Sequence, residues 1–438
     1  MRWTIPLTLA LALAISAHAR AEDWPQWMGP NRDGVWNESG ILAKFPEGGP
    51  KIVWRVPIKG GYAGPAVANG KVYVADYESN FDFRKPNNPG SRSPVDGKER
   101  VLCLDAATGK EIWKHEYDCR YAISYGAGPR CTPTVADGKV YSLGAEGNLF
   151  CLNAEKGSVI WSKEFKKDYK SKTPIWGVCG HPLVDGKQLI CIVGGESATV
   201  VAFDKDTGQE LWKGLSAREP GYSAPVIIEA AGKRQLLIWD SDALNGLDPA
   251  TGKPYWAVNL KPYAAMAIMV PRKTGDYLFA GGVFGVNAMF KLAADKPGAE
   301  EVWRGNNKIG VTPVNMTPFA DGDCLYGVDN SGDLMAVEVK TGKRLWSTPA
   351  PVTGKKKENS GTAFIVKNGD RYFIFNELGE LIIAKLSSEK YDEIARAKIL
   401  ETTNNAFGRN VVWSHPAFAN KCMFARNDKE IVCVSLAE

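Results

Sequence analysis

One phrase of apolar and polar positions recurs along this chain. It first occurs as CLDAATGKEIW (103–113), where an apolar run is followed by an acidic residue, a Thr-Gly pair and a second apolar run. Asp bonds its own backbone two residues on, and Gly accepts a positive φ. The phrase therefore predicts two short antiparallel strands joined by a tight turn, with Trp eight residues after the acidic position. Further copies end at Trp161, Trp212, Trp256 and Trp346.

Each copy closes a longer repeat of four strands. Before the second copy stands TPTVADGKVYSLGAEGNLF, which reads as strand, Asp-Gly turn, strand, Gly turn and strand. We call the four strands A, B, C and D, in chain order. The recurring phrase spans strands C and D and is called the C–D phrase. Trp residues of successive repeats are 43 to 51 positions apart. A period of this length with four strands per repeat is typical of a β-propeller.

The two ends of the chain complete one another in this interpretation. Seven C–D phrases are recognisable, although the fifth (KLAADKPGAEEVW) is loosened and the seventh lacks Trp. The last segment, VVWSHPAFANKCMFARNDKEIVCVSL, supplies strands A, B and C, whereas KIVWRVPI (51–58) is a strand D without a blade. Pairing of 51–58 with 431–436 would remove an open sheet edge. The sequence therefore predicts an all-β, eight-bladed β-propeller closed by an N-terminal strand in the last blade.

One large aromatic side chain per repeat is expected to hold neighbouring blades together. A Trp on the outer strand D can lie across the next blade and over its turn Gly. Loss of one such buried Trp should cost about 3–5 kcal/mol. The predicted docking residues are Trp54, Trp113, Trp161, Trp212, Trp256, Trp303 and Trp346.

The pattern Ala-x-Asp-x-x-Thr-Gly-x-x-x-Trp resembles the tryptophan-docking repeat of the quinoprotein (PQQ-type) propellers. That resemblance implies one of two classes: PQQ-dependent alcohol dehydrogenases, or non-catalytic periplasmic propellers like BamB, the scaffold of the outer-membrane β-barrel assembly machinery. The stretch DWPQWMGPNRDGVW is also similar to the N-terminal arm of secreted, PQQ-binding-like propellers of planctomycete-type bacteria.

The first segment predicts export. MRWTIPLTLALALAISAHARA (1–21) has a basic start, a short apolar run and an Ala-Arg-Ala cleavage site, as a secretory signal peptide does. The apolar run is too short for a stable membrane span, so we expect a periplasmic or secreted protein that is not integral to the membrane. The mature chain would consist of an N-terminal arm (22–50) and the propeller (51–438).

Two further features refine this picture. The first Cys is Cys103, so no lipid-anchor Cys stands beside the cleavage site, in contrast to BamB, which is a lipoprotein. The formal charge of +5 falls to +3 once Arg2 and Arg20 are removed with the signal. A nearly neutral chain does not favour nucleic-acid binding.

Nine Cys in an oxidising compartment leave at least one thiol unpaired. If Asn427-Asp428 is a two-residue turn, Cys422 and Cys433 stand opposite each other across a hairpin, within reach of a disulfide. Cys119 and Cys131, which span the link between the first two blades, are a second candidate pair.

The chain offers little for catalysis. His181 and His415 precede Pro at the start of strands A and are expected near the central channel, whereas His115 is expected to be solvated on an outer strand. Two His without a carboxylate are a weak metal signal, so no metal site is predicted. The quinoprotein dehydrogenases resemble one another in an adjacent Cys pair, a calcium or lanthanide site built from Glu, Asn and Asp, and a catalytic Asp. This chain has no adjacent Cys pair.

The working face is predicted from loop length. The A–B and C–D turns are short and define a short-turn face, while the long B–C insert and D–A links lie on the opposite, long-loop face. Binding residues concentrate on variable loops of a rigid scaffold, and these loops carry aromatic and cationic side chains. The candidate binding residues are Tyr125, Arg130, Trp176, Arg409 and Trp413, with His181 and His415 just below them.

The leading hypothesis is a non-catalytic, monomeric propeller that binds a protein or other polymer of the cell envelope, without catalytic residues or a cofactor. The alternatives are a PQQ-dependent oxidoreductase, with PQQ and calcium as cofactors, and a carbohydrate-binding or carbohydrate-active propeller.

Overall fold

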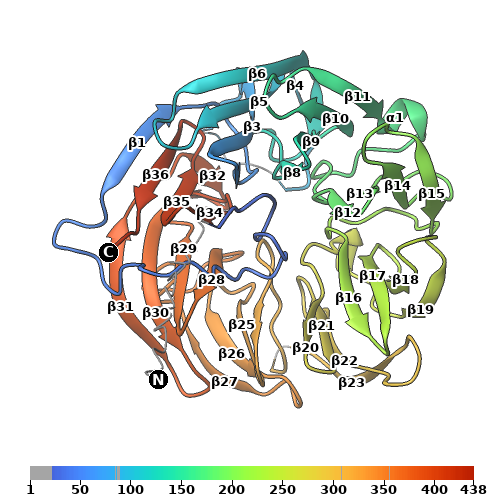
Figure 1. The fold of residues 1–438 in the computed structure, drawn as a ribbon. Helices are drawn as coiled ribbons and strands as arrows, with labels where there is room; N and C mark the ends of the chain where they lie inside the picture. Colours follow the sequence, from blue (N-terminus) through green and yellow to red (C-terminus); the bar gives the residue numbers. More distant parts are fainter. Residues whose placement is uncertain (1–21, 84, 86–88, 307, 355) are drawn as a thin grey trace, which may run out of the picture.

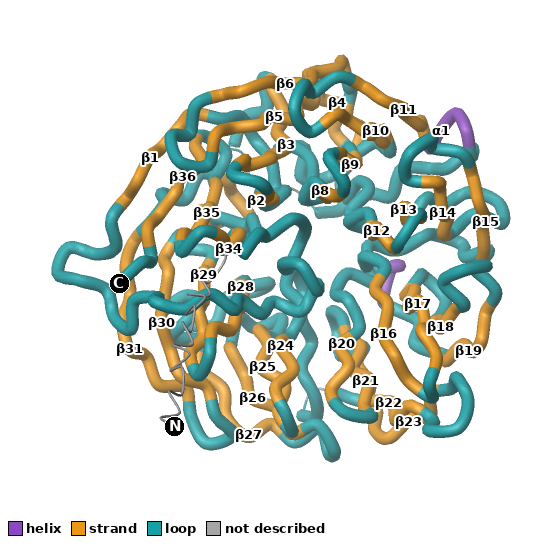
Figure 2. The backbone as a smooth tube through the Cα atoms, in the orientation of Figure 1, coloured by secondary structure: helices purple, strands orange, loops and turns teal. Residues whose placement is uncertain are grey.

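Eight antiparallel sheets of four strands stand in a ring (Figure 1), which confirms the predicted all-β, eight-bladed propeller. The structure is a computed structural model that describes residues 22–83, 85, 89–306, 308–354 and 356–438. The predicted signal peptide (1–21) lies outside these residues. Strands form the ring, and loops occupy much of its centre (Figure 2).

The blades follow the chain, each with its strand A nearest the axis. Blades 1 to 4 are β2(Ala66–Ala68), β3(Lys71–Ser79), β5(Gly97–Asp105) and β6(Glu111–Asp118); β8(Thr134–Ala136), β9(Lys139–Leu143), β10(Asn148–Asn153) and β11(Val159–Glu164); β12(Leu183–Asp185), β13(Gln188–Ile192), β14(Val200–Asp204) and β15(Glu210–Gly214); and β16(Val226–Ala230), β17(Lys233–Trp239), β18(Leu244–Leu247) and β19(Pro254–Val258).

The second half of the ring repeats the same order. Blades 5 to 8 are β20(Arg272–Thr274), β21(Tyr277–Gly281), β22(Asn287–Leu292) and β23(Ala299–Arg304); β24(Phe319–Asp321), β25(Cys324–Val328), β26(Leu334–Glu338) and β27(Arg344–Thr348); β28(Ala363–Asn368), β29(Arg371–Asn376), β30(Glu380–Leu386) and β31(Tyr391–Lys398); and β34(Ala417–Ala419), β35(Cys422–Arg426), β36(Glu430–Ser435) and β1(Ile52–Pro57).

Blade 8 is closed by the N-terminal strand, as predicted. β1 pairs antiparallel with β36, with Trp54 opposite Cys433 and Pro57 opposite Glu430. Both ends of the ring thus share one sheet, and blade 8 can open only if the β1–β36 ladder breaks.

Five of the predicted docking Trp residues lie over the turn Gly of the next blade. Trp54 shows the arrangement: its Nε1 donates to the carbonyl of Ala106 at 3.0 Å, and a Cβ added at Gly109 would stand 2.8 Å from its ring. Gly109 has a φ of +73°, a conformation that L side chains adopt rarely. The turn thus requires Gly both for its backbone and for contact with the indole. The other four are Trp113, Trp161, Trp212 and Trp303.

Trp256 and Trp346 depart from this prediction. Trp256 packs over Gly246 of its own blade and donates to Gln235, because the following C–D turn is the loosened fifth phrase. Trp346 donates to the carbonyl of Ser387 at 2.8 Å, in a turn that has no Gly. Degraded turns therefore change where the preceding indole packs.

Substitution of one docking Trp tests whether its indole holds neighbouring blades together. An exposed neighbour on the same strand serves as the control. Trp113 is 8% exposed, whereas its neighbour Ile112 on β6 is 45% exposed. We expect Trp113→Ala to lower the free energy of unfolding by about 3–5 kcal/mol, and Ile112→Ala by less than about 1 kcal/mol. Urea unfolding of both variants measures the difference, and equal losses would contradict a docking role.

The N-terminal arm (residues 22–50) reaches the middle of the ring on the short-turn face (Figure 1). Trp24 exchanges backbone hydrogen bonds with Val67 of β2, and the Trp36 amide donates to the carbonyl of Lys367 in β28. Both indoles are almost fully buried. The arm therefore crosses the ring from blade 1 to blade 7 and is part of its core.

Arg32 fixes the arm to blades 3 and 4. Its guanidinium is 2% exposed and donates to the carbonyls of Pro182, His181 (3.2 Å) and Pro225 (3.1 Å). Burial lowers the pKa of Arg32 to about 9. In turn, Arg272 of β20 donates to the Arg32 carbonyl at 2.8 Å. The arm is thus held by charged donors on backbone carbonyls.

Small elements on the long-loop face were not predicted. Two small antiparallel sheets stand beside the main sheets: β4(Ser93–Val95) pairs with β7(Tyr121–Ile123), and β32(Asn404–Ala406) forms a hairpin with β33(Arg409–Val411). Two single turns of helix, α1(Phe165–Asp168) and η1(Tyr263–Ala265), lie in D–A links. In the part of the chain that is described, no helix has the length and apolarity needed to cross a membrane.

The predicted cysteine pairs are not formed. The observed register places Cys433 opposite Phe424 and Cys422 opposite Ser435, so the predicted register is wrong by two residues. All nine Cys are free thiols, including Cys119 and Cys131. Contact with Cys433 nevertheless lowers the pKa of the Cys422 thiol.

His115 is not solvated as predicted. Its ring lies 4.7 Å from that of Phe150 in the next blade, and burial lowers its pKa. It therefore contributes to blade packing.

Candidate functional site

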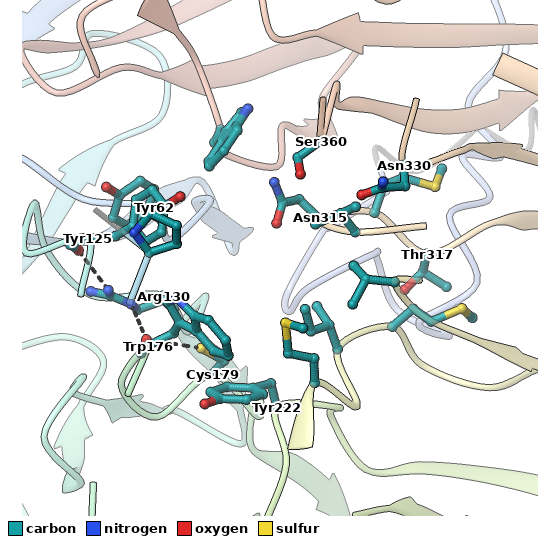
Figure 3. A pocket seen from close by; sticks show the side chains of 18 of the residues that line it. Tyr62, Tyr125, Arg130, Trp176, Cys179, Tyr222, Asn315, Thr317, Asn330 and Ser360 are labelled. Carbon is teal, nitrogen blue, oxygen red and sulfur yellow. Dashed lines mark hydrogen bonds between the residues drawn. The ribbon is translucent and has the colours of Figure 1, made fainter. Parts of the chain in front are cut away.

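A cavity of about 590 Å³ opens on the long-loop face at the ring axis. We call it the central cavity. The D–A links that precede the strands A supply most of its wall, and the B–C segments of blades 1, 5 and 6 contribute as well. Ten aromatic side chains line it, together with two His and three Met. Figure 3 shows side chains from several blades pointing into this space.

The N-terminal arm forms the floor of the cavity through Trp27. The ring of His181 stacks on Trp27 (centroids 4.8 Å apart, planes at 9°), and His415 contacts it edge-on at 5.6 Å. His181 Nδ1 accepts from the Thr132 amide at 2.9 Å, and His415 packs on Phe364 at 3.9 Å. Both His therefore line the central cavity, close to the ring axis.

Both His are neutral in the folded protein. Burial, followed by the charges of Arg32 and His415, lowers the pKa of His181 well below its usual value. Burial lowers the pKa of His415 to about 3. The surface that each His retains faces the cavity.

Stability should therefore fall on acidification through these two residues. The unfolded chain binds protons at His near pH 6.5, whereas the folded chain does not until far lower pH. Between pH 6.5 and about 4, the free energy of unfolding should decrease by up to about 1.4 kcal/mol per pH unit per His. The variant His181→Gln/His415→Gln should show a shallower slope in urea unfolding over this range. An unchanged slope would contradict the assignment of neutral His.

The wall beside blades 1, 2 and 8 is a chain of touching aromatic rings. Tyr125 contacts Tyr62 (centroids 6.4 Å apart) on one side and Trp413 (5.9 Å) on the other. Further round, Trp176 contacts Tyr222 edge-on at 5.5 Å. Figure 3 shows Tyr62, Tyr125, Trp176 and Tyr222 along one side of the cavity.

Arg130 organises this wall. Its guanidinium donates to the carbonyls of Ser124 (2.8 Å), Tyr125 (2.7 Å), Trp176 (2.8 Å) and Gly128. It also lies over the Tyr62 ring, 5.1 Å from the centroid. The guanidinium of Arg130 thus holds two D–A links together beneath the aromatic surface.

Three aromatic residues stand exposed at the mouth. Tyr263, Phe284 and Phe407 are 59%, 63% and 40% exposed. Phe284 and Phe407 have φ values of +57° and +52°, and Tyr125 in the wall has +54°. A left-handed backbone costs a bulky residue about 1–2 kcal/mol, and such strain clusters at functional sites.

The opposite wall is polar. Asn315, Thr317, Asn330, Asn359 and Ser360 line it. Figure 3 shows Asn315, Asn330 and Ser360 across the cavity from the tyrosines.

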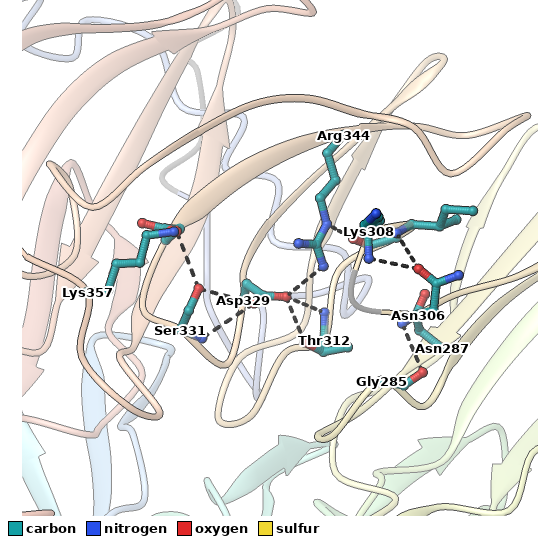
Figure 4. A network of polar contacts seen from close by, with 12 residues as sticks. Gly285, Asn287, Asn306, Lys308, Thr312, Asp329, Ser331, Arg344 and Lys357 are labelled. Carbon is teal, nitrogen blue, oxygen red and sulfur yellow. Dashed lines mark hydrogen bonds and ion pairs between the residues drawn. The ribbon is translucent and has the colours of Figure 1, made fainter.

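A buried carboxylate positions this polar wall (Figure 4). Asp329 accepts from the Thr312 amide at 3.0 Å and the Thr312 hydroxyl at 2.7 Å, and Arg344 lies 3.5 Å away. The adjacent Asn330 carbonyl accepts from the Ser360 amide at 2.8 Å. The B–C turn of blade 6 thereby fixes the links on both sides of it.

Arg409 does not line the cavity. It forms an ion pair with Glu377, which is fully buried, at 2.8 Å. Glu377 also accepts from Trp413 Nε1 at 3.1 Å and the Thr362 amide at 3.0 Å. Arg409 therefore holds Trp413 in place through Glu377, outside the cavity. The sequence interpretation predicted neither this role of Arg409 nor the role of Glu377.

The other six predicted binding residues all line the cavity: Tyr125, Arg130, Trp176, His181, Trp413 and His415. The sequence interpretation missed Trp27, Tyr263, Phe284 and Phe407. A signal was present for two of these residues, because Phe284 and Phe407 each precede Gly, where a turn favours Asn.

The donor set does not fit a calcium-bound quinone. The residues that line the cavity include the amides of Asn315, Asn330 and Asn359 but no Asp or Glu. Calcium prefers carboxylate oxygens among six to eight oxygen ligands. Among the described residues, no three His, Cys, Asp or Glu side chains gather to hold a metal ion.

Similar proteins fall into both classes suggested by the repeat. BamB from Shewanella oneidensis is 26% identical over 235 residues, 50% of this chain and 56% of that protein, so the chain spans about half the length of this relative. The crystal structure of BamB from Moraxella catarrhalis has a TM-score of 0.56 at 18% identity, covering 88% of this chain and 97% of that one.

The fold is also similar to that of enzymes. Quinohemoprotein alcohol dehydrogenase from Comamonas testosteroni has a TM-score of 0.62 at 13% identity, covering 95% of this chain and 81% of that one. The family described as outer membrane protein assembly factor BamB matches residues 97–348 and 240–438. Since these matches span most of the sequence, the chain belongs to this family of PQQ-type propellers.

Proposed function

We propose that this protein is a non-catalytic scaffold of the cell envelope, periplasmic or secreted, which binds a segment of a protein partner in the central cavity. The observation that carries the proposal is an aromatic cavity on the long-loop face, with exposed aromatic side chains in left-handed backbone at its mouth. Aromatic residues with a polar surround are enriched where proteins bind partners.

The titratable groups of the cavity favour binding over proton transfer or nucleophilic attack. Both His have a lowered pKa, and one has its Nδ1 engaged by the Thr132 amide. Burial raises the pKa of the Cys179 thiol to about 11, which leaves little thiolate at neutral pH. Arg130 is surrounded by backbone carbonyls. None of these groups is a ready general base or nucleophile.

An apolar segment of protein suits the cavity better than a sugar does. A sugar carries hydroxyl groups around its ring, and each buried hydroxyl needs a partner. Here the apolar side chains of Met266, Met269, Val270 and Met316 lie among the aromatic ones, and the Asn, Thr and Ser side chains occupy one wall only. An apolar side chain inserted from the long-loop face would be buried on all sides.

Phe407 offers a test with a matched control. Phe407-Gly408 forms a two-residue turn between Ala406 and Arg409, and Ala231-Gly232 forms the same turn between Ala230 and Lys233 on the short-turn face. Asn is favoured at the first position of such turns. Phe407→Asn should relieve strain and leave stability unchanged or higher, yet lower affinity for the partner at least about tenfold. Ala231→Asn should raise stability by up to about 1 kcal/mol with no effect on affinity.

Peptides selected from a random displayed library on the wild-type protein provide the ligand for this measurement. We expect them to share an aromatic or branched apolar anchor, and their affinities are compared by fluorescence anisotropy. Equal affinity of both variants, or no selected peptide, would contradict the proposal.

The quinoprotein alternative rests on the similar fold of the alcohol dehydrogenases. Purified protein supplied with PQQ and calcium is assayed for dye-linked oxidation of an alcohol panel. PQQ-dependent turnover would overturn the proposed function in favour of an oxidoreductase.

A further inference from the structure

A second hollow, of about 880 Å³, leaves the central cavity between blades 2, 3 and 4 on the long-loop face. We call it the side groove. Its walls are the B–C insert of blade 1, the link that follows α1, the B–C turn of blade 3 and the link from β15 to β16. Pro89, Gly90, Trp176 and Ala264 line both hollows. A chain anchored in the cavity can therefore continue past Trp176 into the groove.

Basic side chains outnumber acidic ones along the side groove. The basic residues are Arg92, Lys170, Lys172 and Arg218, against Glu196 and Glu219. Arg92 is held by the carbonyls of Ala122 (3.1 Å) and Thr173 (3.0 Å). Lys170, Lys172 and Arg218 are exposed, and none of them has an ion pair among the described residues. These three cations are available to a ligand.

The central cavity itself is nearly free of available charge. Its one Arg lies against carbonyls, and its two His are neutral. Charge and apolar surface are thus divided between two adjoining hollows. Such a division selects a ligand that has an apolar end and an anionic continuation.

We infer that the side groove binds the acidic residues of a partner segment whose apolar anchor fills the central cavity. This inference rests on the proposed function and names the chemistry of the partner. An extended peptide advances about 3.3 Å per residue, so a few residues beyond the anchor reach past Trp176. Carboxylates then lie among Lys170, Lys172 and Arg218, where exposed charges favour association in a salt-dependent manner.

Three synthetic peptides test the inference, each with a Trp anchor followed by four Glu, four Lys or four Ala. At low salt we expect the Glu peptide to bind the wild-type protein about tenfold more tightly than the Ala peptide and still more tightly than the Lys peptide. Fluorescence anisotropy in low and in roughly molar salt should show the preference disappearing as charges are screened.

The variant Lys170→Gln/Lys172→Gln/Arg218→Gln should lose the preference for Glu but retain the affinity for the Ala peptide. A matched control, Lys110→Gln/Lys156→Gln/Lys253→Gln, removes three exposed cations from C–D turns on the opposite face and should behave like the wild type. Equal binding of the Glu and Lys peptides, or of both variants, would overturn the inference. Tighter binding of polygalacturonate than of the Glu peptide would also overturn it.

These measurements distinguish failure of the side-groove inference from failure of the proposed function of the cavity. If the Ala peptide binds and Phe407→Asn weakens it, the cavity binds apolar anchors whatever the groove does. If no peptide binds, both the inference and the proposed function fail.

Discussion

A chain that lacks residues 22–58 will lose the cooperative fold of the propeller. This deletion removes β1, which closes blade 8, and Trp54, which docks on blade 1. It also removes Trp24 and Trp36, both almost fully buried. A buried Trp contributes about 3–5 kcal/mol, and the whole free energy of unfolding is about 5–15 kcal/mol. Three such side chains, with the β1–β36 ladder, account for most of it.

Deletion of residues 22–48 separates the arm from the closing strand. From the sequence alone, which separates an N-terminal arm (22–50) from the propeller (51–438), the shorter deletion should be much the milder one. Because the arm contributes Trp24, Arg32 and Trp36 to the core, we now expect it to lower the melting temperature strongly as well. Differential scanning calorimetry of both deletions, with Val53→Ala on the exposed side of β1 as the control, measures the effects. Melting of either deletion within a few degrees of the full chain would contradict closure and docking by this segment.

Local turn chemistry explains why the fold could be predicted from the sequence. Asp-Gly and Asn-Gly pairs mark most of the A–B turns, and the Thr-Gly phrase marks half of the C–D turns. The orphan strand at 51–58 then required an eighth blade. The burial of the N-terminal arm could not be predicted in this way, because it depends on carbonyls from distant blades that meet only at the axis. Pro182 and Pro225, both bonded to Arg32, are an example.

The error in the cysteine register has a local cause. Asn427 Oδ1 accepts from the amides of Lys429 (2.8 Å) and Glu430 (2.9 Å), and the Asn427 amide donates to the Glu430 carbonyl (3.0 Å). The centre of the turn is therefore Asp428-Lys429 and not Asn427-Asp428. The ladder consequently resumes with Arg426 opposite Ile431. The Asn427 side chain thus competes for backbone amides, and every residue pair of this hairpin differs from the predicted register by two positions.

Loop length predicted on which face of the ring the site lies, but not which residues form its floor and its supports. Six candidate residues line the central cavity because the D–A links converge on the axis in any propeller. The roles of Trp27 as a floor and of Glu377 as the partner of Arg409 depend on contacts between segments far apart in the chain. The mouth residues Phe284 and Phe407 depend on backbone conformation, which no alternation of polar and apolar residues reveals.

The largest expected effect on binding is a difference between the two faces of the ring. Every observation that favours the proposed function lies on the long-loop face: the cavity, the exposed aromatic rings and the side groove. The turns of the other face are short, and the arm occupies the ring centre on that side. A partner segment that uses the cavity must therefore approach residues such as Tyr263, Phe284 and Phe407 closely.

Photo-crosslinking in intact cells measures this difference most directly. A benzophenone amino acid is placed singly at Tyr263, Phe284 or Phe407 and, for comparison, at the exposed C–D turn residues Lys110, Lys156 or Lys253. We predict discrete protein adducts from the three cavity positions, and none from the three turn positions. Adducts from the turn positions alone, or no protein adduct from any cavity position, would contradict the claim that the central cavity binds a protein partner.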